Sequence, residues 1–184
     1  MPTATLAPIR FRFEAHKAQA PLHSIVGLHE GIDLHAALKA CYFSDKDHLN
    51  QHGRPIFGAT YRAMRYGPVP LEIYEMAKAE PLWLAELDLD DLPWTLRGHQ
   101  LYRNPSWNEA PNMRALSPTD RETLGKGCQR AHVMTFDERT AATHARDWQA
   151  AQLGLMRYED MLDDGPGKAE RVAELRASAS FMRL

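Results

Sequence analysis

Residues 48–74, with the sequence HLNQHGRPIFGATYRAMRYGPVPLEIY, restrict the folds open to this chain more than any other stretch. Gly53 suits the left-handed position that ends a helix, and Pro55 follows where a helix cannot continue. Pro68 and Pro70 fix their own φ angles and favour extended backbone in the residues before them. The stretch therefore predicts a helix ending near Gly53, a stiff extended connector, and a second helix with Pro70 as its first residue.

This stretch also carries long side chains that suit a binding surface. They are Arg54, Tyr61, Arg62, Arg65 and Tyr66. Arginine and tyrosine are enriched at the energetic centres of protein–protein interfaces, and they also occur on nucleic-acid surfaces. In the alternative interpretation the tyrosines pack inside the protein and the arginines pair with Asp45, Asp47 or Glu72. We treat the five side chains as candidate partner-binding residues and leave the alternative open.

Two helices are predicted before the connector. Asp33 is a good N-cap for a helix over residues 34–52, in which apolar side chains recur at helical spacing. A helix over residues 14–30 is expected in two pieces, because Pro21 lies inside it. Residues 9–13 alternate apolar side chains with arginines, which indicates either a short strand or an extended arm that packs its aromatic rings.

The chain after the connector predicts further helices and one β-hairpin. Strands over residues 94–96 and 100–102 flank an Arg-Gly-His turn. Ser117 caps a helix that runs to about residue 132. Thr135 and Glu138 form a capping box that opens a helix to about residue 151.

The C-terminal part of the chain begins at a clear break, the Asp-Asp-Gly-Pro-Gly run of residues 163–167. Residues 168–184 then place Val172, Leu175 and Met182 on one face of an amphipathic helix. Such a face docks either on the core of the protein or on a partner. These three residues are therefore further candidates for partner binding, and truncation at the break is expected to weaken binding while leaving the domain folded.

Together these elements predict a mainly α fold. We expect a compact helical domain with a small β-hairpin or sheet and an amphipathic C-terminal helix. The expected division is a loose N-terminal arm over residues 1–10, one domain over residues 11–165, and a tail helix over residues 166–184.

Composition narrows the classes of partner and the compartment. The net charge of −2 and the pI near 6.5 give no overall basic field, so nucleic acid is not the expected partner. Neither a secretory leader nor a long apolar run is apparent, which predicts a cytoplasmic protein without a membrane partner. Cys41 and Cys128 lack metal-site spacing, and we expect both to be reduced core thiols.

Catalytic and metal-binding patterns are weak in this sequence. His48 and His52 stand four residues apart on a predicted helix, but the glutamate of a His-Glu-x-x-His site and a third ligand are missing. We expect His52 to interact with the helix C-terminus and His48 to be a surface or packing residue. His144, near Trp148, is expected to be a hydrogen-bonded core histidine. We assign no catalytic residue, no cofactor and no metal ligand.

A set of residues spread over the chain resembles the Panacea domain, the SocA-like antitoxin family of bacteria and phages. The matching positions are Lys39, Tyr42, Phe43, Asp45 to His48, Gly53-Arg54-Pro55, Tyr61, Ala63-Met64, Tyr66 to Pro70, Tyr74, Leu116-Ser117, Thr143-His144 and Trp148. The resemblance covers about residues 11–165, and its specificity lies in the combination of Gly-Arg-Pro with Tyr-Gly-Pro-Val-Pro. The sequence departs from the family pattern at Gly58-Ala59 and at Leu71, where glycine-aspartate and serine are often found.

The resemblance implies a mostly helical fold and a non-enzymatic function. It implies an antitoxin that neutralises a cognate protein toxin by direct binding, and in SocA-type members also an adaptor that delivers the toxin to the ClpXP protease. Two alternatives from other classes remain, a metal-dependent enzyme that uses the histidines and a DNA-binding autoregulator. The resemblance further implies that Gly53-Arg54-Pro55 and Tyr66 to Pro70 are structural, and that toxin specificity lies on more exposed positions.

Overall fold

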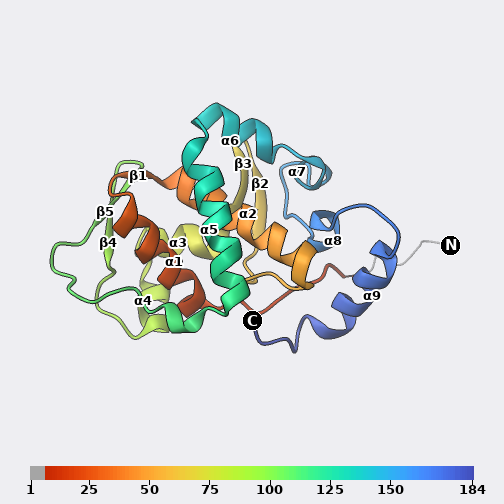
Figure 1. Ribbon diagram of the computed structural model, residues 1–184, viewed down its shortest axis with the longest axis horizontal. Helices are drawn as coiled ribbons and strands as arrows, with labels where there is room; N and C mark the ends of the chain where they lie inside the picture. The colour runs from red at the N-terminus through yellow and green to blue at the C-terminus, as the bar shows by residue number, and fades with distance from the viewer. Residues whose placement is uncertain (1–6) are drawn as a thin grey trace.

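The computed structural model describes residues 7–184 and shows a mainly helical protein with two small antiparallel sheets (Figure 1). This confirms the predicted fold class. Helices α2 (Leu34–His52) and α5 (Pro118–Val133) pack along each other at the centre. None of the helices in the described part of the chain is long and apolar enough to cross a membrane.

Helix α2 has the bounds and the caps that the sequence predicts. The Asp33 side chain accepts a hydrogen bond from the backbone N–H of His35, and Gly53 takes a left-handed conformation with φ of 72°. These caps satisfy backbone groups that a helix end leaves without partners. Helix α5 is capped in the same way, because Ser117 and Asp120 bond reciprocally to each other's backbone N–H.

The stretch predicted to be an extended connector forms a β-hairpin, and this pairing was not predicted. Strand β2 (Tyr61–Met64) pairs with strand β3 (Gly67–Pro70), and Pro70 ends the strand and caps helix α3 (Leu71–Ala77) instead of beginning it. Its prediction as the first helical residue is therefore wrong by one position. The segment around residues 154–156 covers the outer edge of β2.

The geometry of this hairpin explains how a strand holds two prolines. On β2, the Ala63 N–H and the Tyr61 carbonyl bond to residues 154–156, on the side away from β3. Strand alternation therefore makes Arg62 and its neighbour on β3 the hydrogen-bonded pair. Pro68 and Pro70 then turn their nitrogen atoms outward, where the missing N–H costs no ladder bond.

The second sheet contains the hairpin that the sequence predicts. Strands β4 (Trp94–Arg97) and β5 (Gln100–Arg103) pair around a turn, and the short strand β1 (Ile32–Asp33) adds to the other edge of β5. Helix α4 (Pro81–Leu87) follows α3 in the chain and precedes β4. A 3₁₀ turn, η1 (Met113–Ala115), precedes α5.

Two predicted helix boundaries are wrong. Helix α1 (Ala15–Leu28) continues through Pro21, whose ring is buried, so that core packing outweighs the one backbone hydrogen bond that proline removes. The helix predicted to reach residue 151 is instead split into α6 (Phe136–Thr143) and α7 (Arg146–Ala150). At the split the Thr143 hydroxyl donates to backbone carbonyls of its own helix, which favours a bend.

The N-terminal residues in the described part form an extended arm and no strand. Phe11 packs edge-on against Tyr158, with ring centroids 4.8 Å apart, and Phe13 packs against Trp83 at 5.1 Å. Ile9 is buried. The predicted loose arm falls mainly on residues 1–6, which lie outside the described residues.

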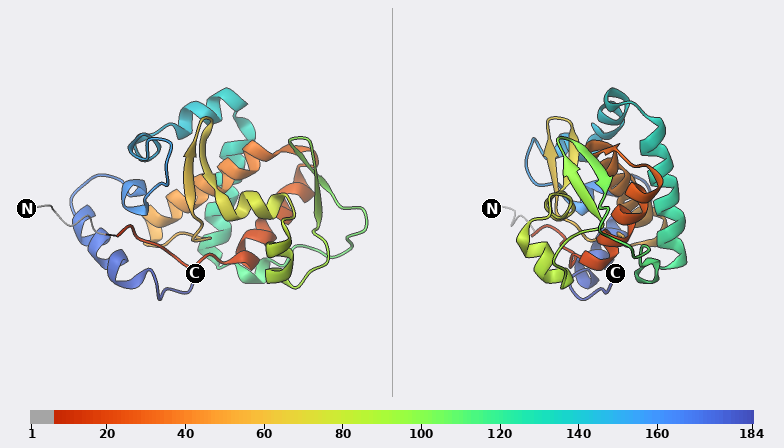
Figure 2. Two further views of the ribbon diagram at one scale, coloured as in Figure 1. Left: turned by 180° about the vertical axis from the view of Figure 1, so that it is seen from behind. Right: turned by 90° about the vertical axis from the view of Figure 1, so that its left-hand side faces the viewer.

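The tail forms helix α9 (Lys168–Ser178), shorter than predicted, and it docks on the protein near helix α8 (Tyr158–Met161). Leu175 and Ala179 are buried, and Arg176 forms an ion pair with Glu159 at 2.7 Å. Helix α9 lies at the opposite end of the molecule from the β4–β5 hairpin (Figures 1 and 2).

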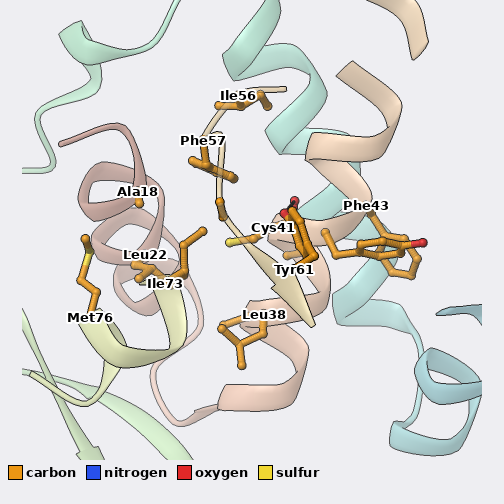
Figure 3. Close-up of a cluster of buried hydrophobic side chains, with 14 of the residues drawn as sticks. Ala18, Leu22, Leu38, Cys41, Phe43, Ile56, Phe57, Tyr61, Ile73 and Met76 are labelled. Atoms are coloured by element: carbon orange, nitrogen blue, oxygen red, sulfur yellow. Dashed lines mark hydrogen bonds between the residues drawn. The ribbon is translucent and has the colours of Figure 1, made fainter. Parts of the chain in front are cut away.

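The core draws buried side chains from elements along the whole described chain, from Ile9 to Ala179. Figure 3 shows side chains from α1, α2 and α3 meeting around the β2 strand, among them Leu22, Cys41, Tyr61 and Ile73. On its other side α2 approaches α5 closely, because Gly127 has no side chain to keep the helices apart. A Cβ atom at Gly127 would meet the Ser44 hydroxyl and would lie 2.9 Å from the Ala40 carbonyl oxygen.

Two glycines of α5 therefore offer a matched test of this close approach. We expect Gly127→Ala to lower the free energy of unfolding by about 1–3 kcal/mol, because the added methyl overpacks the α2–α5 contact. Gly125→Ala, with open space around the added methyl, should raise it by about 0.5–1 kcal/mol. Urea denaturation of both variants measures the difference, and equal effects would contradict the packing argument.

Candidate partner-binding site

Asp45 of α2 points inward and holds the segment before the hairpin in place. The buried Asp45 carboxylate accepts the backbone N–H groups of Ile56 (2.7 Å) and Phe57 (3.0 Å) and the hydroxyl of Tyr61 (3.0 Å). Burial raises the pKa of Asp45 to about 7, although these three hydrogen bonds favour the charged form. Asp45 thus fixes the loop that leads into β2.

A second buried carboxylate, Asp120, connects three segments. It lies 2.8 Å from Lys17 Nζ of α1, 2.8 Å from Arg54 Nη2 and 3.2 Å from His48 Nε2 of α2. Burial acts to raise the pKa of Asp120, but the Lys17 ammonium, the Ser117 N–H and the Arg54 guanidinium outweigh it and lower that pKa. The carboxylate is therefore charged at neutral pH and serves as a structural anchor.

The tip of the β2–β3 hairpin is fixed by the segment after α6. His144 Nε2 lies 3.1 Å from the Arg65 carbonyl oxygen, and the Trp148 indole N–H donates to the Met64 carbonyl at 2.9 Å. The His144 and Trp148 rings stack with centroids 3.8 Å apart. Gly67, with φ of 101°, lets the hairpin pass close to α2 and α6.

A cavity of about 690 Å³ opens beside this hairpin. Its walls come from the start of α2, the β2–β3 turn, α3, the β4–β5 turn and the start of α6. Most lining side chains are apolar or aromatic, including Leu34, Leu38, Met64, Val69 and Tyr74. This size and composition are typical of pockets that bind an apolar group of a ligand or partner.

Aromatic and cationic side chains form the rim of the cavity. Tyr66 is 47% exposed and Phe136 is 38% exposed, and their rings meet edge-on at 5.2 Å. The Arg65 guanidinium lies 5.2 Å from the Tyr66 ring centroid. The His35 ring packs against the Phe136 ring with centroids 4.2 Å apart and the ring planes tilted by 31°. We call Arg65, Tyr66, Phe136 and His35 the rim of the cavity.

His35 holds the rim to the rest of the protein. Its Nδ1 accepts a hydrogen bond from Arg139 Nε at 3.2 Å, so Nε2 carries the proton that is donated to the Tyr66 carbonyl at 3.0 Å. Burial and the Lys39 charge lower the pKa of His35 to about 4. The ring is therefore neutral at pH 7, and its position is fixed by both nitrogen atoms.

The five candidate side chains of residues 54–66 have different locations. Tyr61 is buried, and Arg54 lies against Asp120, so neither is available to a partner in this conformation. The alternative interpretation paired the arginines with Asp45, Asp47 or Glu72. It is wrong for Arg54, which pairs with Asp120. Arg62 and Arg65 are exposed, as is Tyr66, and only Arg65 and Tyr66 line the cavity.

Of the three tail candidates, Val172 and Leu175 lie on α9, at the opposite end of the molecule from the β4–β5 hairpin (Figure 2), and Met182 follows that helix in the chain. Leu175 is buried against the domain, whereas Val172 and Met182 are half-buried. Next to them, Phe181 is 86% exposed.

The histidines and cysteines have structural surroundings. His48 places Nδ1 2.8 Å from the Arg54 carbonyl oxygen and Nε2 3.2 Å from the Thr119 hydroxyl, so both ring nitrogens already have protein partners. Within residues 7–184, no cluster of three or more histidine, cysteine or acidic side chains could hold a metal ion. Burial raises the pKa of Cys41, and it raises the pKa of Cys128 to about 11, which disfavours a reactive thiolate.

Sequence reasoning missed several residues of the cavity. Neither His35 nor Phe136 was among the candidate residues selected from the sequence, yet both line the cavity. Lys39 was noted for its family position alone, yet it is buried and lines the cavity. The spacing of His35 and Lys39, four residues apart on one helix, was the available signal that they share a face.

Comparison with known families identifies the class of protein. The family model described as antitoxin SocA-like, Panacea domain, matches residues 38–149, which is more than half of the chain. The chain therefore belongs to the SocA-like Panacea family of antitoxins. A comparison with curated proteins and another with solved structures gave no match.

Asp45 gives a pH-dependent prediction for this site. Its pKa is raised from 3.8 to about 7 in the folded state, so between these pH values the folded protein binds a proton that the unfolded chain lacks. Stability therefore falls as pH rises through this window. The Asp45→Asn variant keeps an acceptor oxygen but does not titrate at this position. We therefore expect its free energy of unfolding, relative to that of the wild type, to rise by about 1.4 kcal/mol per pH unit in this window.

Denaturant unfolding of both proteins between pH 4 and pH 8 measures this difference. Asp90→Asn, a change at an exposed carboxylate, is the control. Parallel stability curves for Asp45→Asn and the wild type would show that Asp45 is charged throughout the window.

Proposed function

We propose that this protein is the antitoxin of a toxin–antitoxin pair and that it neutralises its cognate protein toxin by direct binding, without catalysis of its own. Family membership supports a toxin as the partner. The observation that carries the proposal is the rim, where Tyr66, Phe136 and Arg65 stand exposed over an apolar cavity. Exposed aromatic and arginine side chains around an apolar pocket are typical of interface hot spots.

The internal contacts of residues around the hairpin support the rim of the cavity as the binding site. Asp45 and Trp148, at family positions, make internal contacts that hold the hairpin, and Asp120, outside those positions, does the same for the loop before it. The tip of the hairpin is therefore held rigidly. A rigid aromatic anchor loses little entropy on binding, which favours affinity. Tyr66, which the resemblance implies to be structural, is 47% exposed at that tip, and the adjacent Arg65, outside the family positions, is exposed as well. Both side chains are free to contact a partner.

We further propose that the bound toxin is handed to the ClpXP protease, as in the SocA-type members that the sequence resembles. Helix α9, which the exposed Phe181 follows in the chain, lies at the opposite end of the molecule from the β4–β5 hairpin, whose turn lines the cavity (Figure 2). A second partner could therefore contact it while the toxin is bound. A shorter toxin half-life with the antitoxin than without it, lost when ClpX is removed, would support delivery; an unchanged half-life would leave masking as the mechanism.

The rim gives a mutational test of toxin binding. We expect the double variant Tyr66→Ala, Phe136→Ala to weaken affinity for the product of the neighbouring gene at least about tenfold, because hot-spot truncations cost about 2 kcal/mol or more. Growth under co-expression should fail in parallel. Leu82→Ala, which removes a 65% exposed side chain from α4, is the matched control and should bind normally. Wild-type affinity in the double variant would move the interface elsewhere.

The tail gives a separate test of whether Val172, Leu175 and Met182 belong to the interface. Deletion after Asp164 removes the buried Leu175 and its contacts, so we expect a folded domain with a lower melting temperature. If the tail contacts the toxin, affinity measured well below that melting temperature should also fall. Unchanged affinity would show that α9 only packs against the domain.

A further inference from the structure

Two buried cations beside the cavity have no acidic partner. Lys39 is 1% exposed and Arg139 is 7% exposed. Among residues 7–184, neither forms an ion pair within 4.0 Å, whereas the buried Lys17, Asp120 and Asp147 do. A buried charge without a counter-charge is costly, and such groups are found most often at functional sites.

The hydrogen bond of Lys39 leaves two of its N–H donors unused. Lys39 Nζ donates to the Pro68 carbonyl oxygen at 2.7 Å, and this is its one acceptor in the described part of the chain. An ammonium group has three N–H donors, so two remain available. Burial and the neighbouring Arg139 charge lower the pKa of Lys39 to about 7. The surroundings therefore lack the negative charge that would stabilise this ammonium.

The lining of the cavity places this cation in apolar surroundings. Lys39 shares the cavity with Leu34, Leu38, Val69 and Tyr74. The single acidic residue among the lining side chains is Asp33, which caps α2 through the His35 N–H. An occupant that matches the cavity must bring both an apolar group and a negative charge.

We propose that this cavity receives the C-terminal residue of the toxin, an apolar residue whose carboxylate pairs with Lys39. Within a protein, only a chain-terminal residue carries an apolar side chain and a carboxylate together. The volume of about 690 Å³ accommodates such a residue and its neighbour. Tyr66 and Phe136 then cover the apolar side chain. This inference rests on the proposed function, because it takes the occupant to be a segment of the toxin.

A pair of small probes tests the chemistry of the cavity without the toxin. N-acetylphenylalanine carries the carboxylate, and its amide is neutral but otherwise the same. We expect the acid, at millimolar concentration, to shift the backbone NMR signals of Tyr66, Gly67 and Phe136, and the amide to bind at least about tenfold more weakly. Equal binding of the two probes, or no shift with the acid, would overturn the proposal.

Substitution of the lysine assigns the preference to one side chain. Lys39→Met keeps the length of the side chain and should remove the preference for the acid, whereas Lys126→Met, at an exposed position of α5, should retain it. A preference that survives Lys39→Met overturns the proposal. The comparison of acid and amide on the unaltered chain decides the matter even if Lys39→Met fails to fold.

The toxin itself separates this inference from the proposed function. Removal of the last residue of the toxin, or Lys39→Met in the antitoxin, should weaken their complex. If both changes leave affinity intact while the wild-type pair binds, the cavity assignment fails and the antitoxin function stands. If the wild-type protein does not bind its neighbouring gene product but still prefers the acid probe, the antitoxin function fails and the cavity chemistry stands.

Discussion

The charge on Asp120 is the interaction on which the arrangement of the other elements depends. A carboxylate with no solvent exposure needs compensation from inside the protein, and here it comes from Lys17 on α1 and Arg54 after α2, with the His48 ring beside it. Loss of either cation would leave a buried charge less well compensated. One side chain of α5 therefore holds both α1 and the loop before the hairpin in position.

The sequence predicted correctly those elements whose ends depend on capping and turn residues close by in the chain. The caps at Asp33 and Gly53 fixed the bounds of α2, and the Arg-Gly-His turn marked the β4–β5 hairpin. Prediction failed where distant contacts decide. The β2–β3 hairpin forms in a proline-rich segment because the segment around residue 155 covers β2 and because both proline nitrogens face outward. Helix α1 likewise continues through Pro21 because the core buries its ring, and no local pattern reports that.

The candidate site was predictable only in part, for the same reason. Tyr61 and Tyr66 looked alike in the sequence, but one lies inside the sheet and the other at the hairpin tip, so one is buried and the other exposed. The cavity is built from five segments between residues 33 and 136. Its unpaired Lys39 can be identified only when the surrounding side chains are known, because the sequence offers several acidic residues that could have been its partner.

The two outward-facing prolines of β3 have a consequence for how the surface of the hairpin can change during evolution. A free strand edge normally offers N–H donors to an added strand, but Pro68 and Pro70 have none, and the Pro68 carbonyl is already bound to Lys39. The hairpin is thus poorly suited to recognition through the backbone. Side chains at the tip are exposed, so substitutions there can alter this surface while the scaffold stays unchanged.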